Sequence, residues 1–364
     1  LSFIAMLAGA FMVLSFAPVG VYAFAFVSPA ILCYLWLRST AKQAFTRGFY
    51  FGFGFFLAGI SWVYISIHNF GNASTWLATL ITLLFVCFMA LFFATQGYVF
   101  RYVFQNKSER IQCLLAFPAL WLIWEWLRSV IFTGLPWLLL GYSQTSSPLH
   151  GLAPTIGTYG MTLCTVLIAG AIALMNRYTT LKDKFISLGI IFVIIVAAWI
   201  LNNKEWTQPK TEPIQASLIQ GNFNQFLKWD SKTLTTILDT YKDLSEQHTD
   251  SQLIVWPEAA IPYYPSQLNH YVDDINTLGK DNDITFIIGA PTFVRDKKQY
   301  YNSLLMYGKY QGQYNKQHLV PFGEYTPWNK LVTPLMRSFS IPMSNFTSGD
   351  KVAVHLLRGG NRFI

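Results

Sequence analysis

Two short stretches of this 364-residue sequence combine charged side chains with apolar and backbone-restricting residues, a mixture that can support catalysis. The stretch Tyr314–Pro327 carries Lys316, His318 and Glu324 among aromatic residues, proline and glycine. Lysine and glutamate rarely lie among apolar residues unless they are paired, and proline and glycine favour a fixed loop over a helix. The stretch therefore predicts a constrained loop that presents opposite charges beside apolar surface. Taken alone, it fits a surface loop with one ion pair equally well.

The second stretch, Leu253–Pro262, favours catalysis. An apolar run typical of a strand leads into Pro257 and ends at Glu258. Sheets of α/β proteins usually place their chemistry at the carboxyl ends of strands, so Glu258 lies where a functional carboxylate is expected. The alternative interpretation is an exposed carboxylate at a strand end. Glu258 and Lys316 are therefore the first candidates for a functional site.

The composition indicates a membrane protein. Hydrophobic residues make up 53% of the chain and charged residues only 12%, which is far more apolar than an ordinary soluble protein. Long apolar runs recur through the first two hundred residues, as in polytopic membrane proteins. About seven candidate spans are found at residues 1–16, 21–37, 48–67, 76–100, 111–131, 158–175 and 185–201.

The positive charge of the chain indicates topology rather than a nucleic-acid partner. Nearly all of the net charge of +8 lies within residues 1–201, in loops beside the predicted spans. Three basic loops, at residues 38–47, 101–110 and 177–184, alternate with uncharged ones. Basic loops mark the cytoplasmic side. This pattern predicts an amino terminus inside the cell and places everything after residue 201 outside the membrane.

One ion pair is predicted inside the membrane. Glu125 and Arg128 are three residues apart in the fifth candidate span, on one face of a helix. Charges are costly in lipid, so the two groups are expected to neutralise each other toward the interior of the bundle. We favour a structural clamp; a proton or substrate role is the alternative. A transporter that uses this pair is a rival function, but the large domain after residue 201 argues against it.

The pattern changes after residue 212. Short strand-like runs alternate with helical patterns, which predicts a layered α/β domain. Strands are expected at 214–219, 253–256, 284–289, 301–307 and 352–357, and helices at 231–247 and 271–278. The sequence thus predicts a transmembrane helical bundle over residues 1–201, a linker at 202–211 and an α/β domain over 212–364.

Nearly the whole chain resembles the apolipoprotein N-acyltransferases, the membrane-bound branch of the nitrilase superfamily. The most specific matches are Trp-Pro-Glu-Ala-Ala-Ile-Pro at 256–262 and Asn-Lys-Gln-His-Leu-Val-Pro-Phe-Gly-Glu-Tyr-Thr-Pro at 315–327. Weaker matches are Trp-Val-Tyr-x-Ser-Ile at 62–67 and Gly-Tyr-Ser-Gln at 141–144. The resemblance implies that residues 212–364 form about the first half of an α-β-β-α nitrilase-like sandwich, so that this domain is incomplete.

The resemblance also implies an activity and its partners. Members of this family take an acyl chain from a phospholipid and attach it to the amino-terminal cysteine of a diacylated apolipoprotein, through a cysteine thioester. The implied partners are the phospholipid donor, the apolipoprotein acceptor and the membrane, with no cofactor, no metal and no nucleic acid. The implied location is the bacterial inner membrane, with the α/β domain in the periplasm.

Four residues take roles from the resemblance. Glu258 matches the base, Lys316 matches the cation that stabilises the tetrahedral intermediate, and Glu324 matches a second carboxylate that supports the lysine or its loop. Trp229 matches a tryptophan near the acyl or head-group site, and a ring packed under a loop is its alternative. For His318 we expect a core or supporting position rather than a general base.

The family's nucleophilic cysteine is not found in this sequence. Cys33, Cys87, Cys113 and Cys164 all lie in the predicted spans, where each is interpreted as a small buried hydrophobic residue, and no disulfide or metal motif links them. We expect a fragment that is inactive alone and lacks the second half of the sandwich and a closing membrane helix. The alternatives are a non-catalytic membrane protein that binds lipid or lipoprotein, and a natural pseudo-enzyme with a nitrilase-like domain.

Overall fold

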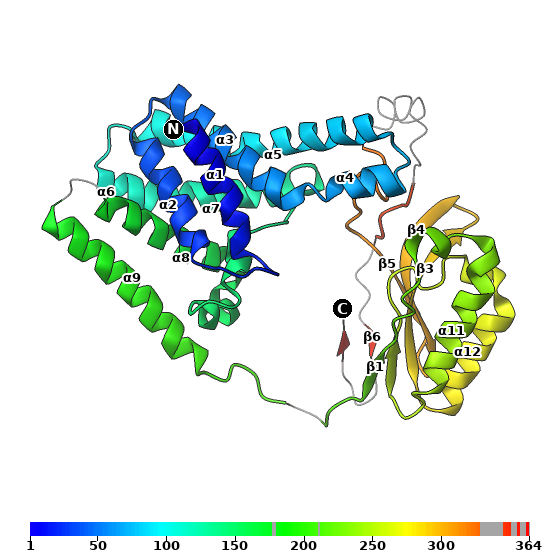
Figure 1. Ribbon diagram of the computed structural model, residues 1–364. Helices are drawn as coiled ribbons and strands as arrows, with labels where there is room; N and C mark the ends of the chain where they lie inside the picture. Colours follow the sequence, from blue (N-terminus) through cyan, green and yellow to red (C-terminus); the bar gives the residue numbers. More distant parts are fainter. Residues whose placement is uncertain (177–179, 210–211, 328–344, 351–354, 357–361, 364) are drawn as a thin grey trace. The chain divides into compact units, whose positions relative to one another are not determined.

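The computed structural model describes residues 1–176, 180–209, 212–327, 345–350, 355–356 and 362–363 (Figure 1). The chain divides into two compact units, Leu1–Thr207 and Gln208–Ile364, and each is described by itself. The boundary falls inside the stretch predicted as a linker. The predicted fold class, a helical bundle followed by an α/β domain, is confirmed.

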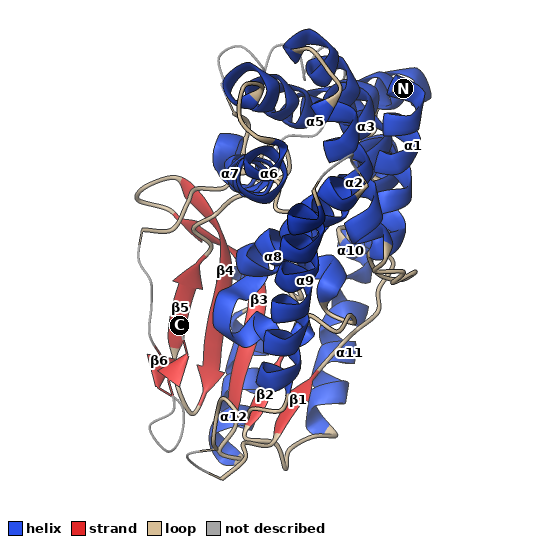
Figure 2. Ribbon diagram, turned by 90° about the vertical axis from the view of Figure 1, so that its left-hand side faces the viewer, coloured by secondary structure: helices blue, strands red, loops and turns tan. Residues whose placement is uncertain are grey.

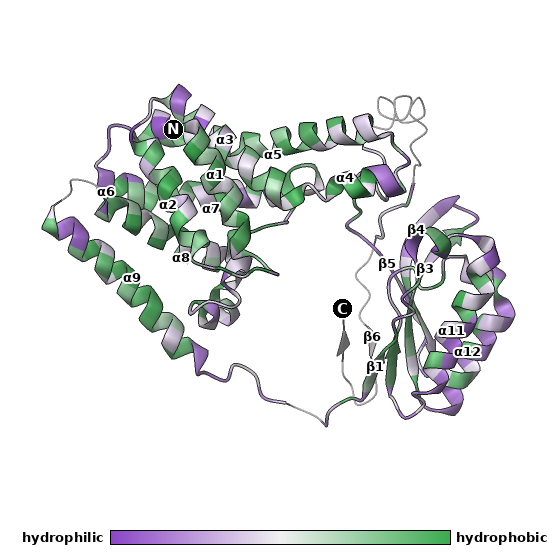
Figure 3. Cartoon of the chain, viewed as in Figure 1, coloured by the Kyte–Doolittle hydropathy of each residue, from purple (hydrophilic) through white to green (hydrophobic). Residues whose placement is uncertain are grey.

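The first unit is built from apolar helices. They are α1 (Ser2–Met12), η1 (Val13–Ser15), α2 (Phe24–Leu37), α3 (Ala41–Ile60), α4 (Val63–Ile65), η2 (Ser66–Phe70), α5 (Thr75–Phe104), α6 (Glu109–Ile111), η3 (Gln112–Ala116), α7 (Phe117–Val130), η4 (Ile131–Thr133), η5 (Leu140–Gln144), η6 (His150–Leu152), α8 (Ala153–Met175) and α9 (Leu181–Asn202). Figure 3 shows hydrophobic residues along most of their length, with polar residues gathered near the helix ends.

The helices support membrane spans, but they do not test the predicted number of crossings. Among the described residues, four helical stretches are long and apolar enough to cross a membrane: Thr75–Phe104, Glu109–Thr133, His150–Met175 and Leu181–Asn202. The stretch from α3 through η2 is a fifth candidate if its 57° bend lies within one span. The helices Ser2–Ser15 and Phe24–Leu37 are shorter. Seven crossings therefore stay a prediction.

Small residues allow the helices of the bundle to approach closely. A Cβ atom added to Gly48 of α3 would lie 2.3 Å from the carbonyl oxygen of Phe93 in α5, and one added to Gly52 would lie 2.8 Å from the Cα atom of Ala90. The Gly-x-x-x-Gly spacing of these two glycines is typical of such packing between membrane helices. Next to this contact, Phe93 packs against the buried ring of Trp121, with 5.1 Å between the ring centroids.

The second unit contains a five-stranded sheet in the order β1-β2-β3-β4-β5. Strands β1, β2 and β3 are parallel, whereas β3, β4 and β5 are antiparallel neighbours. Figure 2 shows α11 and α12 on one face of this sheet. The strands are β1 (Ala216–Leu218), β2 (Leu253–Val255), β3 (Thr285–Val294), β4 (Gln299–Gly308), β5 (Gly312–Asn315), and a separate pair, β6 (His355–Leu356) and β7 (Arg362–Phe363). The helices are α10 (Gln225–Lys228), η7 (Ser231–Thr233), α11 (Leu234–Glu246), η8 (Pro265–Gln267) and α12 (Asn269–Asp281).

Most elements of the second unit agree with the sequence prediction. Both predicted helices and the first four predicted strands are present, with β3 extending five residues further than expected. The predicted strand at 352–357 lies mostly outside the described residues. Strand β5 was missed: the start of the expected catalytic loop, Tyr314 and Asn315, belongs to a strand that pairs with β4.

Trp256 anchors the centre of the second unit. Its ring is 1% exposed and stacks on Tyr241 of α11, with 4.9 Å between the ring centroids. Its indole Nε1 donates a 3.0 Å hydrogen bond to Ser245 Oγ on the same helix. A buried aromatic ring with a satisfied polar atom combines a large apolar contact with a fixed orientation. The chain is therefore held firmly two residues before Glu258.

Candidate active site

Glu258 lies at the carboxyl end of β2, as predicted, and the neighbouring strand fixes its backbone. The chain leaves β2 with a hydrogen bond from Trp256 N to Ile287 O of 2.9 Å, and Ile261 N donates to Gly289 O at 3.3 Å. A Cβ atom added to Gly289 would lie 2.4 Å from the Pro257 carbonyl oxygen and 2.7 Å from the Glu258 Cα atom. A side chain cannot be accommodated there without moving the backbone that carries Glu258.

Lys316 directly follows β5, and its backbone is held on both sides. Its N–H donates to Asn302 O at 2.8 Å, and its carbonyl oxygen accepts from Gly349 N at 3.0 Å. The ammonium Nζ lies 3.0 Å from Glu324 Oε1 and 3.4 Å from Glu258 Oε1. The structure therefore brings together the three residues that the sequence singled out as catalytic.

Glu324 is held by the turn that contains it. Its Oε2 accepts a 2.8 Å hydrogen bond from Val320 N, and its own N–H donates to Val320 O at 2.9 Å. Inside this turn Phe322 adopts a left-handed conformation with φ of 62°. The Glu324 side chain is 13% exposed, whereas the Glu258 side chain is 65% exposed. The two carboxylates thus share one lysine but differ sharply in their access to solvent.

Asn302 of β4 is a member of the site that the sequence did not reveal. Its Nδ2 donates to Glu258 Oε1 at 2.5 Å and to Glu324 Oε1 at 2.7 Å. One amide group thus contacts both carboxylates. The available signal was an asparagine within a run typical of a strand, because asparagine is depleted in strands and needs polar partners there. Only the pairing of β4 with its neighbours shows what those partners are.

The electrostatics assign different protonation behaviour to these groups. Partial burial acts to lower the pKa of Lys316, but the hydrogen bond that Lys316 donates to Glu324 and the charges of both glutamates outweigh it, so its pKa is raised. Partial burial acts to raise the pKa of Glu324, but hydrogen bonds from Val320 N–H, Asn302 and Lys316 lower it overall. Lys316 is therefore a permanent cation and Glu324 a permanent anion near neutral pH. Glu258 is the more exposed of the two carboxylates that contact this lysine.

The structure places Trp229 and His318 on the surface of the second unit. Trp229 directly follows α10 and is 56% exposed, so the alternative of a ring packed under a loop is wrong. The preceding residue, Lys228, donates from Nζ to Glu258 O at 3.3 Å, which brings the end of α10 to the site. His318 is exposed and is not a core residue. The role of Trp229 in substrate binding stays a prediction.

All four cysteines lie in the first unit. Cys33 and Cys113 are buried and Cys87 and Cys164 are partly buried. Each belongs to a helical element, as expected for small apolar residues. Within the described parts of the chain, no group of three or more His, Cys, Asp or Glu residues is arranged to hold a metal ion.

Comparison with known proteins identifies the family. Residues 8–171 match the family described as "Apolipoprotein N-acyltransferase N-terminal domain", and residues 215–362 match the "Carbon-nitrogen hydrolase" family. The chain is 45% identical over 350 residues to the apolipoprotein N-acyltransferase of Coxiella burnetii, covering 96% of this chain and 72% of that protein.

Two further relatives carry the same name. The apolipoprotein N-acyltransferase of Pseudomonas syringae pv. tomato is 37% identical over 354 residues, covering 95% of this chain and 69% of that protein. That of Methylococcus capsulatus is 34% identical over 347 residues, covering 95% of this chain and 68% of that protein. These relatives match 95% or more of this chain, and the carbon-nitrogen hydrolase match at residues 215–362 spans the residues of the site. The chain belongs to the apolipoprotein N-acyltransferase family.

Proposed function

We propose that this protein transfers an acyl chain from a membrane phospholipid to the amino-terminal cysteine of diacylated lipoproteins, through a thioester on a cysteine. Membership of the family supports N-acylation of lipoproteins in general. The observation that carries the finer proposal is the cluster in which Lys316 Nζ lies within 3.4 Å of both Glu258 and Glu324. It supplies a proton carrier beside a fixed cation, the two groups that acyl transfer to and from a thiol requires.

In the first step, Glu258 takes the proton from the cysteine Sγ–H. The thiolate attacks an ester carbonyl carbon of the phospholipid, and the ammonium of Lys316 stabilises the resulting oxyanion. When this intermediate collapses, the carbon–oxygen bond to the glycerol breaks. The departing oxygen takes the proton from Glu258, which leaves a lysophospholipid and the thioester.

In the second step, the α-amino group of the lipoprotein's first cysteine attacks the thioester carbonyl carbon. Glu258 takes a proton from this nitrogen, and Lys316 again stabilises the oxyanion. The carbon–sulfur bond breaks, the amide is formed, and Glu258 returns the proton to the thiolate. Glu324 and Asn302 keep Lys316 and Glu258 in place throughout both steps.

We also propose that none of the four cysteines in residues 1–364 forms this thioester, so that the chain is inactive alone. All four lie in helices of the first unit, where two are buried and two are partly buried. Intact-protein mass spectrometry after incubation with phospholipid tests this. The 364-residue chain should gain no hydroxylamine-sensitive acyl group, whereas a longer chain with a cysteine after residue 364 should gain one. An acyl adduct on the 364-residue chain would contradict the proposal.

The acyl-transfer test uses that longer chain with phospholipid carrying labelled acyl groups and a peptide with a diacylated amino-terminal cysteine. We expect label in amide linkage to the peptide. Transfer of label to water alone would overturn the transferase function. Binding of the peptide without any transfer would favour the alternative of a non-catalytic lipoprotein-binding protein.

The proposed location is the inner membrane, with the second unit in the periplasm. Contacts between the three predicted basic loops support it. Arg101 Nε donates to Ser39 O at 2.8 Å, joining the first loop to the second, and Arg110 pairs with Asp183 at 2.6 Å, joining the second to the third. Basic loops that meet at one end of a bundle fit a single cytoplasmic face.

A surface cysteine in the second unit tests this orientation. Gln247→Cys, at the exposed end of α11, should react with an impermeant thiol reagent in cells whose outer membrane alone is permeable. Labelling that requires opening of the inner membrane would reverse the topology. The parent chain serves as the control for its own cysteines.

A further inference from the structure

The loop between α7 and η5 has an unusual backbone. Three of its non-glycine residues, Phe132, Thr133 and Leu138, have φ values of 56°, 69° and 57°, and Gly134 has a φ of 78°. Residues other than glycine rarely adopt this left-handed backbone conformation. Such residues persist only where the surroundings hold them, and they cluster at functional sites. The loop Phe132–Leu140, named here the aromatic loop, therefore needs an external support.

Arg128 supplies most of that support. Its guanidinium donates from Nη1 to Leu135 O at 3.1 Å and to Trp137 O at 2.5 Å, and from Nη2 to Leu138 O at 3.3 Å. These three carbonyl groups lie within four residues of one another in the aromatic loop. A planar guanidinium presents several donors in a fixed arrangement, which a lysine does not. Arg128 is thus shaped to hold this backbone.

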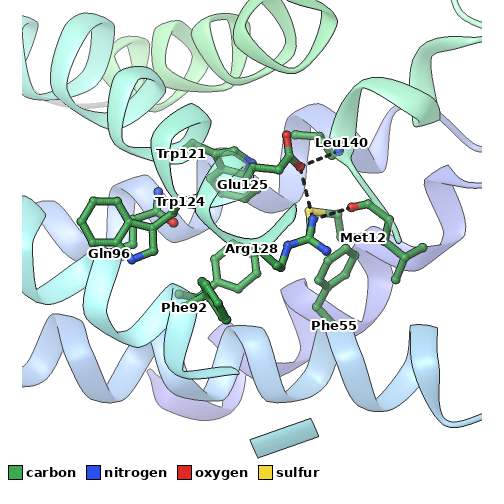
Figure 4. Close-up of a pocket in the computed structure, with 11 residues that line it drawn as sticks. Met12, Phe55, Phe92, Gln96, Trp121, Trp124, Glu125, Arg128 and Leu140 are labelled. Atoms are coloured by element: carbon green, nitrogen blue, oxygen red, sulfur yellow. Dashed lines mark hydrogen bonds and ion pairs between the residues drawn. The ribbon is translucent and has the colours of Figure 1, made fainter. Parts of the chain in front are cut away.

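Glu125 completes the support from the same face of α7. Its Oε1 accepts a 2.7 Å hydrogen bond from Leu140 N and lies 3.7 Å from Arg128 Nη2 (Figure 4). Both side chains are only 5% exposed. Among the described residues, the other side chains that line the adjoining pocket are uncharged and mostly aromatic or aliphatic. The pair therefore neutralises its own charge while its donors and one acceptor are engaged with the loop backbone.

The aromatic loop displays exposed rings. Trp137 is 50% exposed and packs on Trp62, which is 45% exposed, with 5.4 Å between the ring centroids. Phe132 is 58% exposed and packs on Phe88 of α5 at 6.0 Å. Trp62 follows α3, and Phe132 and Trp137 follow α7; both helices belong to candidate membrane spans. Tryptophan rings with an apolar body and a polar N–H are enriched at the boundary between lipid and water.

We propose that Glu125 and Arg128 are positioning residues that clamp the backbone of the aromatic loop, so that Trp62 and Trp137 form a fixed contact surface for phospholipid at the membrane interface. The occupant is phospholipid because the exposed rings are amphipathic and flank candidate membrane spans. Neither residue of the pair transfers a proton. The consequence for substrate, a lower KM for the phospholipid donor, rests on the proposed acyl-transfer function; the clamp itself does not.

Fluorine NMR of protein containing 5-fluorotryptophan tests the clamp without any activity. Trp62→Phe and Trp137→Phe assign the two resonances, and each substitution should shift the resonance of the other ring. In Arg128→Met, the Trp137 resonance should broaden or split because the loop loses three hydrogen bonds. A spin-labelled phospholipid should broaden both resonances in the parent protein. Unchanged Trp137 resonances in Arg128→Met, or no broadening by the lipid, would overturn the proposal.

Arg47→Met is the matched control. Arg47 is another buried arginine of the first unit, 8% exposed, and it donates to Leu35 O at 2.7 Å and to Ser39 Oγ at 2.6 Å. Its loss should lower thermal stability as well but leave the Trp62 and Trp137 resonances in place. An equal disturbance of these resonances in both variants would show a general loss of packing instead of a clamp.

The carboxylate offers a second pair of variants in case Arg128→Met does not fold. Glu125→Gln keeps an oxygen that accepts from Leu140 N, so the Trp137 resonance should stay near its parent position. Glu125→Met leaves that buried N–H without its acceptor and should disturb the resonance. In acyl-transfer assays, disturbed variants should show a several-fold higher KM for phospholipid with kcat unchanged. A fall in kcat alone would contradict the positioning role.

Discussion

The two carboxylate–cation clusters of this protein place similar groups in different surroundings. In the first unit, Glu125 and Arg128 are each 5% exposed, and their hydrogen bonds go to backbone groups. In the second unit, exposure of the side chains rises from 13% at Glu324 through 32% at Lys316 to 65% at Glu258. The buried pair is engaged with the backbone of one loop, whereas the graded cluster keeps one carboxylate open to solvent. Exposure and the identity of the partners, more than residue type, distinguish the two clusters and support the two proposed roles.

The largest effect is expected from Glu258→Gln. The amide cannot accept a proton from a thiol or an amine, so acyl transfer by the protein with its nucleophilic cysteine should fall by roughly a hundred- to ten-thousand-fold. Glu246→Gln, at an exposed position of α11, is the control and should leave the rate unchanged. Near-parent transfer in Glu258→Gln would remove this residue from the mechanism.

Lys316→Met should cost on the order of a hundredfold in acyl transfer, because one donor to the oxyanion is lost. Lys316→Arg should also be poor, since a planar guanidinium does not replace a compact ammonium between two carboxylates. Single-turnover formation of the thioester is the measurement that isolates this step. If Lys316→Arg acylates as fast as the parent protein, charge alone is sufficient and the geometry proposed for the ammonium is wrong.

Asn302→Asp should have a smaller effect that depends on pH. The new carboxylate would face Glu258 and Glu324 in place of a donor. Like charges disfavour ionisation, so the pKa of the base should rise and the acidic limb of the pH–rate profile should move to higher pH. Asn302→Ala, which removes the donor without adding charge, is the comparison. Superimposable profiles for the two variants would argue against contact between residue 302 and the base.

The smallest effect is expected on stability. The pKa of Glu324 is lowered in the folded protein, mainly by hydrogen bonds that outweigh its burial. Ionised Glu324 therefore stabilises the folded protein above the unfolded pKa of about 4.3. This stabilisation is lost as pH falls through the lower, folded value. Glu324→Gln should therefore lack this part of the loss of stability at acid pH.

The measurement is the thermal midpoint of the full chain in detergent from about pH 3 to pH 7. As pH falls, the thermal midpoint of the parent protein should decrease more than that of Glu324→Gln. Parallel curves for the two proteins would mean that the Glu324 pKa is not lowered by folding. The Lys316 pKa is raised, so its stabilising contribution depends on pH in the opposite direction and is lost only at alkaline pH, as pH rises through the folded value.

Sequence reasoning located the charged members of the site because each one departs from its surroundings. Glu258 ends an apolar strand, and Lys316 and Glu324 lie among aromatic residues and prolines. Asn302 could not be located in this way, because its partners lie 44 and 22 residues away in the chain and meet it only through strand pairing. Strand β5 was missed for a related reason: Gly312–Asn315 has no apolar alternation, and its pairing with β4 defines it.

The same limit applies in the first unit. The spacing of Glu125 and Arg128 predicts a shared helix face and a structural role in preference to a relay. It does not predict that their partners are the carbonyl groups of Leu135, Trp137 and Leu138. In the loop that makes those contacts, several residues other than glycine adopt the left-handed backbone conformation. Local propensity argues against this conformation for such residues. Tertiary contacts decide the conformation of this loop.

The close approach at Gly289 has a consequence for how variation in this protein should be interpreted. Position 289 has no functional group, yet the backbone of β3 presses against the residue that carries the proposed base. In a deep mutational scan scored by acyl transfer, it should tolerate substitution as poorly as the charged positions do. Substitution there should reduce expression and folding less than it reduces activity. Comparing a score for expression with the score for acyl transfer would therefore distinguish this position from ordinary core glycines. An alanine there would displace the backbone that carries Glu258 while every reacting atom is still present.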